Sequence, residues 1–507
     1  MKNRHPLIKY AQALLMAEDS YQNSSEIDSA KLSHHIQVGL EHFRVFPVND
    51  FEGKEKVNFD FAMIEKGDTA KGIYMAPNIL STDMLAKNTY KAAHDVLKAI
   101  EKSSLDKTEN VTMSVVPVAG EFLSFSTGGG IGRGKPKTTL LELGLGMIAT
   151  LTPYKPCMQD RGDNTCIIPD LPLDKQVDFI RFFKDMMLHS TSEELKTGRV
   201  KKEETGKKNN IKTTYKPLRP LLFNGNFPNP PKSTTLGGVA LLATIGEFCK
   251  VAEFSERAQK VLDSLKDTPF YLIKYGDAKP FSFNHYVIEL AKTGNLKQIV
   301  DSIYYTVLFN NPHRDFNNTE YQKFDLFSSR FLQLFNNSSF KDFLSFGAEY
   351  PNPIELLFNT YFNKMENIDL EIVKSARHLG KRLNLVAYLA AKAEIKEGTP
   401  NYFEKLREQK AKVLVELESA AFSAKSSDAL IAQVVTRAGR LSGLDMPEEA
   451  DLFMEKTMSS QITLEQAKNL LIAFSRLKNK KEAEEQPTIE EEINKIKESE
   501  IGINEKL

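Results

Sequence analysis

Residues 371–383 read E-I-V-K-S-A-R-H-L-G-K-R-L, and this stretch decides the fold of the C-terminal part of the chain. Apolar side chains recur every three or four residues from Ile372 through Leu379 and Leu383 to Ala390. That spacing places them in one stripe along a helix of 3.6 residues per turn. A helix that is apolar along one side must bury that side, so the stretch predicts a helix packed against other helices.

Four more helices are expected after this one, because capping and helix-breaking residues recur at short intervals. Thr463 and Gln466 have the spacing of a capping box, and Gly398 and Gly443 lie in expected breaks. The five expected helices cover about 368–392, 402–424, 427–441, 447–457 and 463–480. Together they predict an all-α C-terminal helical bundle.

The N-terminal half instead alternates helix-like and strand-like segments. The expected segments are helices at 82–100 and 175–188, one or two helices over 236–265, and strands at 111–119, 121–125 and 270–275. We therefore expect an α+β protein, in which a mixed α/β N-terminal body is followed by the all-α bundle.

A chain of 507 residues has room for several domains, and its composition changes along its length. The expected divisions are a mixed α/β body (1–280) that contains a glycine-rich basic loop (126–139) and a basic flexible insertion (190–232), an aromatic-rich helical section (281–364), a five-helix bundle (365–480) and an acidic tail (481–507). The tail is expected to be disordered or to form a fraying helix.

The glycine-rich loop is the most distinctive motif, since residues 125–140 read F-S-T-G-G-G-I-G-R-G-K-P-K-T-T-L. Glycine lets a backbone approach another surface closely, and neighbouring cations suit a phosphate-rich partner. The candidate nucleic-acid-binding residues here are Gly128, Gly129, Gly130, Gly132, Arg133, Gly134, Lys135 and Lys137.

A nucleotide site is a competing interpretation of this loop. Gly129, Gly134 and Lys135 match the spacing of a P-loop, but Pro136 stands where a magnesium-binding hydroxyl is required. The dinucleotide pattern G-x-G-x-x-G fails because Arg133 occupies its third glycine position. The loop therefore favours contact with a nucleic-acid backbone, with a plain flexible turn and a nucleotide site as alternatives.

Charge is distributed unevenly, although the 67 cations and 67 anions balance over the whole chain. Residues 196–219 hold nine Lys or Arg against two Glu, whereas residues 481–507 hold nine Glu against four Lys. The basic segment is either a solvated loop or an arm that orders on phosphate. Its candidate DNA-binding residues are Lys201, Lys202, Lys207 and Lys208.

Cations also gather on the expected bundle. Lys374, Arg377 and Lys381 lie on the helix face opposite the apolar stripe, within about 60° of one another at about 100° per residue. Arg437 and Arg440 have the i, i+3 spacing that places two side chains on one face. Such surface stripes are either simply solvated or follow a phosphate backbone.

Several classes of protein do not fit the sequence. Cys157, Cys166 and Cys249 are too few for a disulfide framework and are not spaced as zinc ligands. No apolar run reaches the length of a membrane span, and neither H-E-x-x-H nor G-x-S-x-G occurs. We therefore expect a cytoplasmic protein that is not an enzyme and that has no cofactor, metal or membrane partner.

Four stretches together resemble the large subunit of a type I CRISPR surveillance complex, Cascade. They are T-G-G-G-I-G-R-G-K-P-K-T-T-L-L-E-L-G-L-G-M-I-A-T-L-T-P-Y at 127–154, N-T-C-I-I-P-D-L-P-L-D-K-Q-V-D-F-I at 164–180, the helix at 371–383, and V-V-T-R-A-G-R-L at 434–441. The likeness covers most of the chain at the level of architecture.

This resemblance implies an RNA-guided antiviral defence function in which the protein is not itself the nuclease. The subunit would read a short flanking motif (PAM) on double-stranded target DNA, help to separate the strands, hold the displaced single strand and recruit a helicase-nuclease to the guide RNA complex. The glycine loop would contact the duplex, the lysines of the insertion would steer DNA, and the bundle cations would line the displaced strand. The bundle would be small-subunit-like, with Met365 as the candidate internal start of a separate small subunit.

Three other classes remain open at this stage. The chain could be another nucleic-acid-binding assembly scaffold, or a structural protein whose aromatic helices pack on partners. It could also be an enzyme, either a nucleotide hydrolase that uses the loop from Gly128 to Lys135 or a metal-dependent nuclease.

Overall fold

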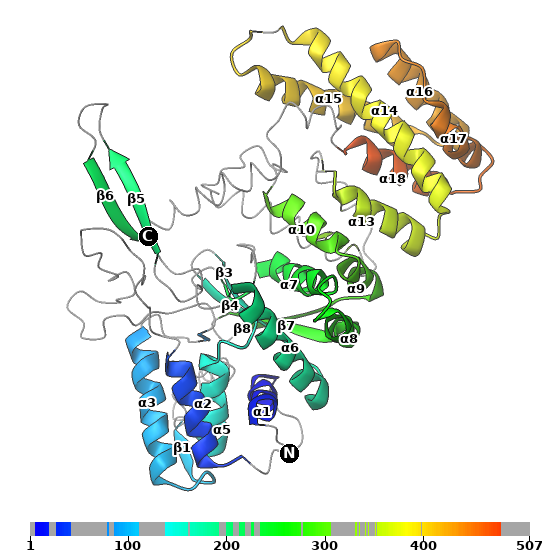
Figure 1. The fold of residues 1–507 in the computed structure, drawn as a ribbon. Helices are drawn as coiled ribbons and strands as arrows, with labels where there is room; N and C mark the ends of the chain where they lie inside the picture. The colour runs from blue at the N-terminus through cyan, green and yellow to red at the C-terminus, as the bar shows by residue number, and fades with distance from the viewer. Residues whose placement is uncertain are drawn as a thin grey trace, which may run out of the picture. The chain divides into compact units, whose positions relative to one another are not determined.

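The computed structural model forms two compact units, built from residues 1–296 and residues 297–500 (Figure 1). The described residues are 6–19, 27–41, 79–80, 86–110, 137–160, 163–191, 199–205, 212–218, 225–227, 234–274, 277–305, 330–331, 334, 340, 343, 350, 352–396 and 398–477.

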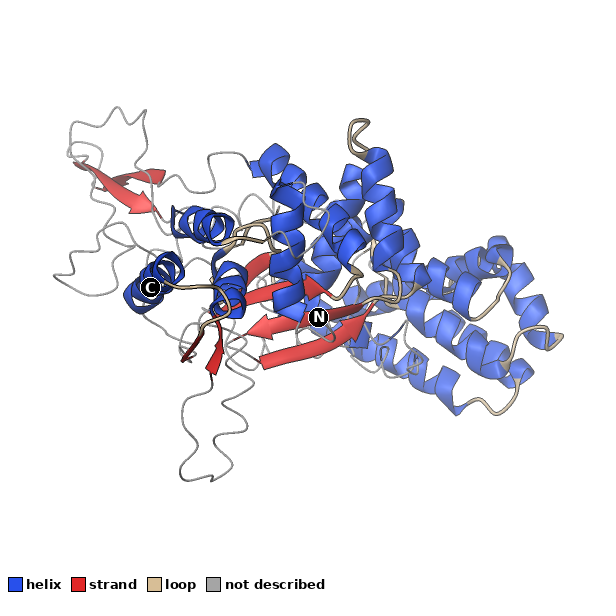
Figure 2. Ribbon diagram, turned by 90° about the horizontal axis from the view of Figure 1, so that it is seen from below, coloured by secondary structure: helices blue, strands red, loops and turns tan. Residues whose placement is uncertain are grey.

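The first unit contains a four-stranded antiparallel sheet with strand order β3-β4-β7-β8 (Figure 2). The strands are β3 (Cys157–Asp160), β4 (Asp163–Pro169), β7 (Pro269–Lys274) and β8 (Asp277–Ser282). The strand expected at 270–275 is therefore observed as β7. The strands expected at 111–119 and 121–125 lie outside the described residues.

Helices cover this sheet and extend the unit beyond it. They are α1 (Pro6–Asp19), α2 (Ser29–Glu41), α3 (Ala86–Lys102), α5 (Leu140–Leu151), α6 (Leu173–Thr191), α7 (Thr234–Phe248), α8 (Ser255–Leu265) and α9 (His285–Lys292). Helix α7 lies against the sheet so closely that a side chain at Gly237 would collide with Met158 of β3. The combination of helices with small antiparallel sheets confirms the α+β class.

Helix α5 shows why sequence periodicity was a weak guide at this point. Ten of its twelve residues are buried, and it contacts α1, α2 and α3. A helix that is apolar on every side has no amphipathic period. The apolar run at 145–151 therefore carried no helical signature, although it forms the end of α5. Helix α5 begins where Thr139 caps it by accepting from Glu142 N at 3.2 Å.

Part of the segment expected to be a basic flexible insertion (190–232) forms a β-hairpin. Strand β5 (Arg199–Thr205) pairs with β6 (Lys212–Leu218), and Lys201 lies opposite Lys216 in the register. Both strands contain residue types that favour extended backbone, namely Val200 and Thr205 in β5 and Thr213, Thr214 and Tyr215 in β6. They do not alternate regularly with the charged residues, so the sequence carried no strand periodicity here.

The second unit is helical over most of its described part. After α10 (Asn295–Tyr305) come α13 (Ile354–Thr360), a π-helix (Tyr361–Met365), α14 (Leu370–Glu394), α15 (Tyr402–Ser423), α16 (Ser427–Ser442), α17 (Asp451–Met458) and α18 (Leu464–Ser475). Helix α14 contacts α15, α16, α17 and α18, and so lies at the centre of this group (Figure 1). The bounds of α14, α15, α16 and α17 lie within about four residues of those expected from the sequence, and α18 starts one residue after its expected start but ends at Ser475, before the expected end at 480.

The apolar stripe of α14 supplies much of the core of this group. Leu379, Leu383 and Ala390 are buried, whereas Ile372 is only half-buried and its neighbour Val373 takes the buried position. Gln466 completes the expected capping box at the start of α18, because both reciprocal hydrogen bonds with the cap residue are present. Local sequence signals therefore located these helices correctly.

Candidate nucleic-acid interface

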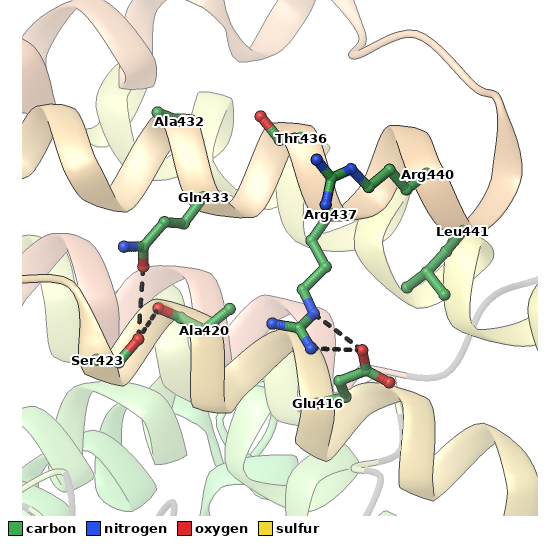
Figure 3. Close-up of a pocket in the computed structure, with 9 residues that line it drawn as sticks. All are labelled: Glu416, Ala420, Ser423, Ala432, Gln433, Thr436, Arg437, Arg440 and Leu441. Atoms are coloured by element: carbon green, nitrogen blue, oxygen red, sulfur yellow. Dashed lines mark hydrogen bonds and ion pairs between the residues drawn. The ribbon is translucent and has the colours of Figure 1, made fainter.

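A groove of about 700 Å³ lies between α15 and α16 in the second unit (Figure 3). Its lining residues are Glu416, Ala420 and Ser423 of α15, and Ala432, Gln433, Thr436, Arg437, Arg440 and Leu441 of α16. The two arginines are residues that the sequence placed on one cationic face. The structure adds the polar side chains around them.

Arg437 spans the groove from α16 to α15. Its Nε and Nη2 donate to Oε1 of Glu416 at 2.9 and 2.7 Å (Figure 3). Both side chains are nearly half exposed, at 47% and 45%, so water competes with the pair and its net stabilisation is small. The pair holds the guanidinium of Arg437 against α15, and the single carboxylate of Glu416 balances only one of the two arginine charges in the groove.

Arg440 lies one turn further along α16 and extends back toward Thr436 (Figure 3). Within the part of the chain that the structure describes, it has no ion-pair partner, unlike Arg437. The hydroxyl of Ser423 donates mainly to the backbone oxygen of Ala420 at 2.9 Å and lies 3.4 Å from Oε1 of Gln433, so the amide N–H groups of Gln433 remain donors. The groove is therefore lined by two guanidinium groups, an amide and a hydroxyl, but by only one carboxylate. Because donors exceed acceptors, the groove suits an acceptor-rich anion.

A closer look at the sequence could have located these neighbours. Gln433, Thr436, Arg437 and Arg440 follow an i, i+3, i+4, i+7 pattern, which places them on one side of a helix. No spacing in the sequence indicates that Glu416 lies in this groove, because Glu416 belongs to a different helix, α15.

The cationic stripe of α14 differs from this groove, because each of its members faces a carboxylate. Lys374 pairs with Glu371 at 2.7 Å, and Arg377 pairs with Glu355 of α13 at 2.7 Å. Lys381 lies 4.0 Å from the same carboxylate, which is only 15% exposed. The two contacts with Glu355 join α13 to α14, and all three compensate part of the positive charge expected for a DNA path.

The remaining predicted site residues are placed only in part. Lys137 is exposed in β2 (Lys137–Thr139), which pairs with β1 (Thr108–Asn110). Lys201 and Lys202 belong to β5. The predicted residues that lie outside the described part are Gly128, Gly129, Gly130, Gly132, Arg133, Gly134, Lys135, Lys207 and Lys208.

A second cluster of reactive groups lies inside the first unit, around Lys155. Its Nζ donates to the backbone oxygens of Thr150 and Thr152 at 3.2 and 2.7 Å, and the side chain is completely buried. Cys157 and Cys166 lie opposite each other on β3 and β4 and are also fully buried. Burial raises the pKa of Cys166 to about 12 and that of Cys157 well above its ordinary value. Thiols that are protonated and sealed from solvent are poor nucleophiles.

Replacement of Lys155 by methionine is expected to change how stability depends on pH. Burial lowers the pKa of Lys155 to about 8, so above that pH the folded chain has released a proton that the unfolded chain still holds. Between about pH 8 and 10, the wild-type free energy of unfolding should rise relative to that of Lys155→Met by about 1.4 kcal/mol per pH unit. Urea unfolding followed by circular dichroism from pH 7 to 10 measures the difference.

The control is built into the comparison, because the quantity of interest is the free energy of unfolding of the wild type minus that of Lys155→Met at each pH. The raised pKa values of Cys157 and Cys166 make stability fall above about pH 8.5 in both proteins, so this contribution cancels. If the difference in the free energy of unfolding between the two proteins did not change with pH, burial would not have lowered the pKa of Lys155.

Neither a metal centre nor a membrane segment is found in the described ranges. No group of three or more His, Cys, Asp or Glu side chains there is arranged to hold a metal ion. Among the same residues, no helix combines the length and apolar character needed to cross a bilayer.

Comparison with known proteins gives one finding. A family model described as CRISPR-associated protein Csp2 matches residues 5–478 of the chain. No curated protein and no solved structure matches. The family match covers both compact units.

Proposed function

The chain belongs to the CRISPR-associated protein Csp2 family, and on that premise we propose that it is the non-catalytic large subunit of a type I CRISPR Cascade complex. The family implies a subunit of the Cascade effector complex, associated with other Cascade subunits and guide RNA. The finer role proposed here is to recognise the flanking motif on duplex DNA, assist strand separation, hold the displaced strand and recruit a helicase-nuclease.

The observation that carries this proposal beyond family membership is the donor-rich groove between α15 and α16. Arg440 and the amide of Gln433 offer donors without an acidic partner of their own in the described residues. A phosphodiester backbone offers acceptors and negative charge at every nucleotide, so it complements such a surface without sequence preference. The displaced strand is held by contacts of this type, and base pairing with the guide supplies the sequence specificity.

The other parts of the proposed site have separate tasks. The loop from Gly128 to Lys135 approaches the duplex and reads the motif, with Lys137 beside it in β2. The lysines of the β5–β6 hairpin and its surroundings steer DNA electrostatically. We further propose that residues 365–480 form an all-α, small-subunit-like bundle. It follows the α/β body (1–280) and the aromatic-rich helical section (281–364) along the chain.

Binding of target DNA by the reconstituted complex tests these tasks, and two classes of variant should behave differently. Arg133→Ala with Lys135→Ala is expected to change which flanking bases are preferred, by about 1–3 kcal/mol for each lost base contact. Arg440→Ala is expected to weaken binding for all sequences and to lower the slope of log K against log salt by about 1. Filter binding or gel shifts over a range of salt concentrations measure both quantities.

Lys405→Ala is the matched control, because it removes one exposed cation from α15 outside the groove. For Lys405→Ala, the slope of log K against log salt should stay at the wild-type value. A wild-type motif preference in the loop variant would refute the proposed reading role. Equal slopes for Arg440→Ala and Lys405→Ala would refute the proposed strand path.

A further inference from the structure

The acidic segment 481–507 has no task in the function proposed above. Its nine glutamates and four lysines give a side-chain net charge of −5, while the groove between α15 and α16 carries two arginines and one glutamate. The two features are therefore opposite in charge and belong to the same chain.

We propose that the acidic segment docks in the α15/α16 groove of its own chain and competes there with nucleic acid. The docking follows from the geometry and charge of the second unit. The competition rests on the proposed function, because it requires that the groove also binds nucleic acid.

Helix α18 and the residue after it contact α15, the helix that forms one wall of the groove, and this brings the acidic segment within reach. Arg476, just after α18, pairs with Glu418 of α15 at 2.7 Å. Lys468 of α18 donates to the backbone oxygens of Phe422 and Ala424 at 3.0 and 2.6 Å. An α-helix is about 10–12 Å across and an extended chain covers about 3.3 Å per residue. Half the circumference of such a helix is about 16–19 Å, so about six residues would carry the chain around α15 to the groove.

The chemistry of the groove fits glutamate carboxylates as well as phosphates. A guanidinium presents its donors in a fork that can bind both oxygens of one carboxylate, and Arg440 has no other ion-pair partner in the described residues. Exposed pairs of this kind are individually weak. A tethered segment nevertheless has an effective concentration in the millimolar range, so weak contacts are enough to keep it bound at low salt. Salt should release it.

Photo-crosslinking in the full chain tests the docking directly. With p-benzoylphenylalanine at position 436 in place of Thr436, we expect cross-links to residues 481–507 within one chain at low salt. The same probe at position 405, in place of Lys405, is the control and should not reach this segment. Loss of the cross-link in high salt and after neutralisation of the segment supports electrostatic docking.

The neutralised variant keeps the chain length and replaces the following residues: Glu482→Gln, Glu484→Gln, Glu485→Gln, Glu490→Gln, Glu491→Gln, Glu492→Gln, Glu498→Gln, Glu500→Gln and Glu505→Gln. The docking proposal is overturned if the cross-link is absent, if neutralisation leaves it unchanged, or if it joins only two different molecules.

Binding of single-stranded oligothymidylate to the same variants tests the competition. At low salt the neutralised variant should bind about tenfold more tightly than the wild type, and Arg440→Ala in that background should remove the gain. Equal affinities of the wild type and the neutralised variant would overturn competition. An intramolecular cross-link with no DNA binding by any variant would leave docking standing and would refute the proposed function of the groove.

Discussion

Replacement of Arg476 by alanine is expected to lower the free energy of unfolding of the C-terminal helices by about 3–5 kcal/mol. Arg476 and Glu418 are 9% and 8% exposed, and their contacts Nε–Oε1 and Nη2–Oε2 are both 2.7 Å. Burial lowers the pKa of Arg476, but the hydrogen bonds and charge of Glu418 outweigh it and raise the pKa above its ordinary value. Loss of the guanidinium leaves the buried carboxylate of Glu418 with no ion-pair partner among the described residues.

Hydrogen exchange of α15 and α18 in urea is the appropriate measurement, because it reports on these helices separately from the first unit. Arg437→Ala is the matched control, since it breaks an exposed arginine–glutamate pair in the same group of helices. Arg437→Ala should lower the free energy of unfolding by less than about 1 kcal/mol. Equal costs for the two variants would contradict the expected penalty for a buried, unpaired carboxylate.

A double variant separates the value of the pair from the cost of breaking it. Arg476→Met with Glu418→Leu removes both charges and fills the space with apolar side chains of similar length. Replacement of a buried pair by packed apolar residues is often neutral or stabilising. The double variant should therefore recover most of the stability that Arg476→Ala loses.

Replacement of Gly380 by alanine is the second change with a large expected effect, a loss of about 1–3 kcal/mol. A Cβ atom there would overlap Cβ of Phe474, and it would lie 2.6 Å from the backbone carbonyl carbon of Phe474 and 2.9 Å from the backbone nitrogen of Ser475. The helices α14 and α18 cannot separate freely, because Asn384 donates to the backbone oxygen of Ser475 at 2.7 Å. The overlap must be relieved by distortion of a packed core.

Gly439→Ala provides a control of opposite sign within the same group of helices. Gly439 lies inside α16, and a Cβ atom there would meet nothing within 4 Å. Alanine at such a position should stabilise the helix by up to about 1 kcal/mol. Urea unfolding followed by circular dichroism suits both variants, since the chain contains no tryptophan. A stabilising effect of Gly380→Ala would show that α14 and α18 do not approach as closely as described.

The candidate site was predicted only in part. Arg437 and Arg440 were identified from spacing alone, because i, i+3 neighbours share a helix face whatever the helix packs against. The acceptor of Arg437 could not be identified in this way, because Glu416 lies twenty-one residues away on another helix. The same limit applied to Arg377, whose partner Glu355 belongs to α13.

The sequence by itself located the five helices α14 to α18 to within a few residues, because apolar periodicity and caps such as Thr463 are local properties. It also determined the uneven charge, with cations on α16 and glutamates after position 480. Only the tertiary structure decided which cations are available to a ligand, because ion pairs form between side chains that are distant in sequence. Packing alone brought Glu355 to α14 and left Arg440 without an acidic partner among the described residues.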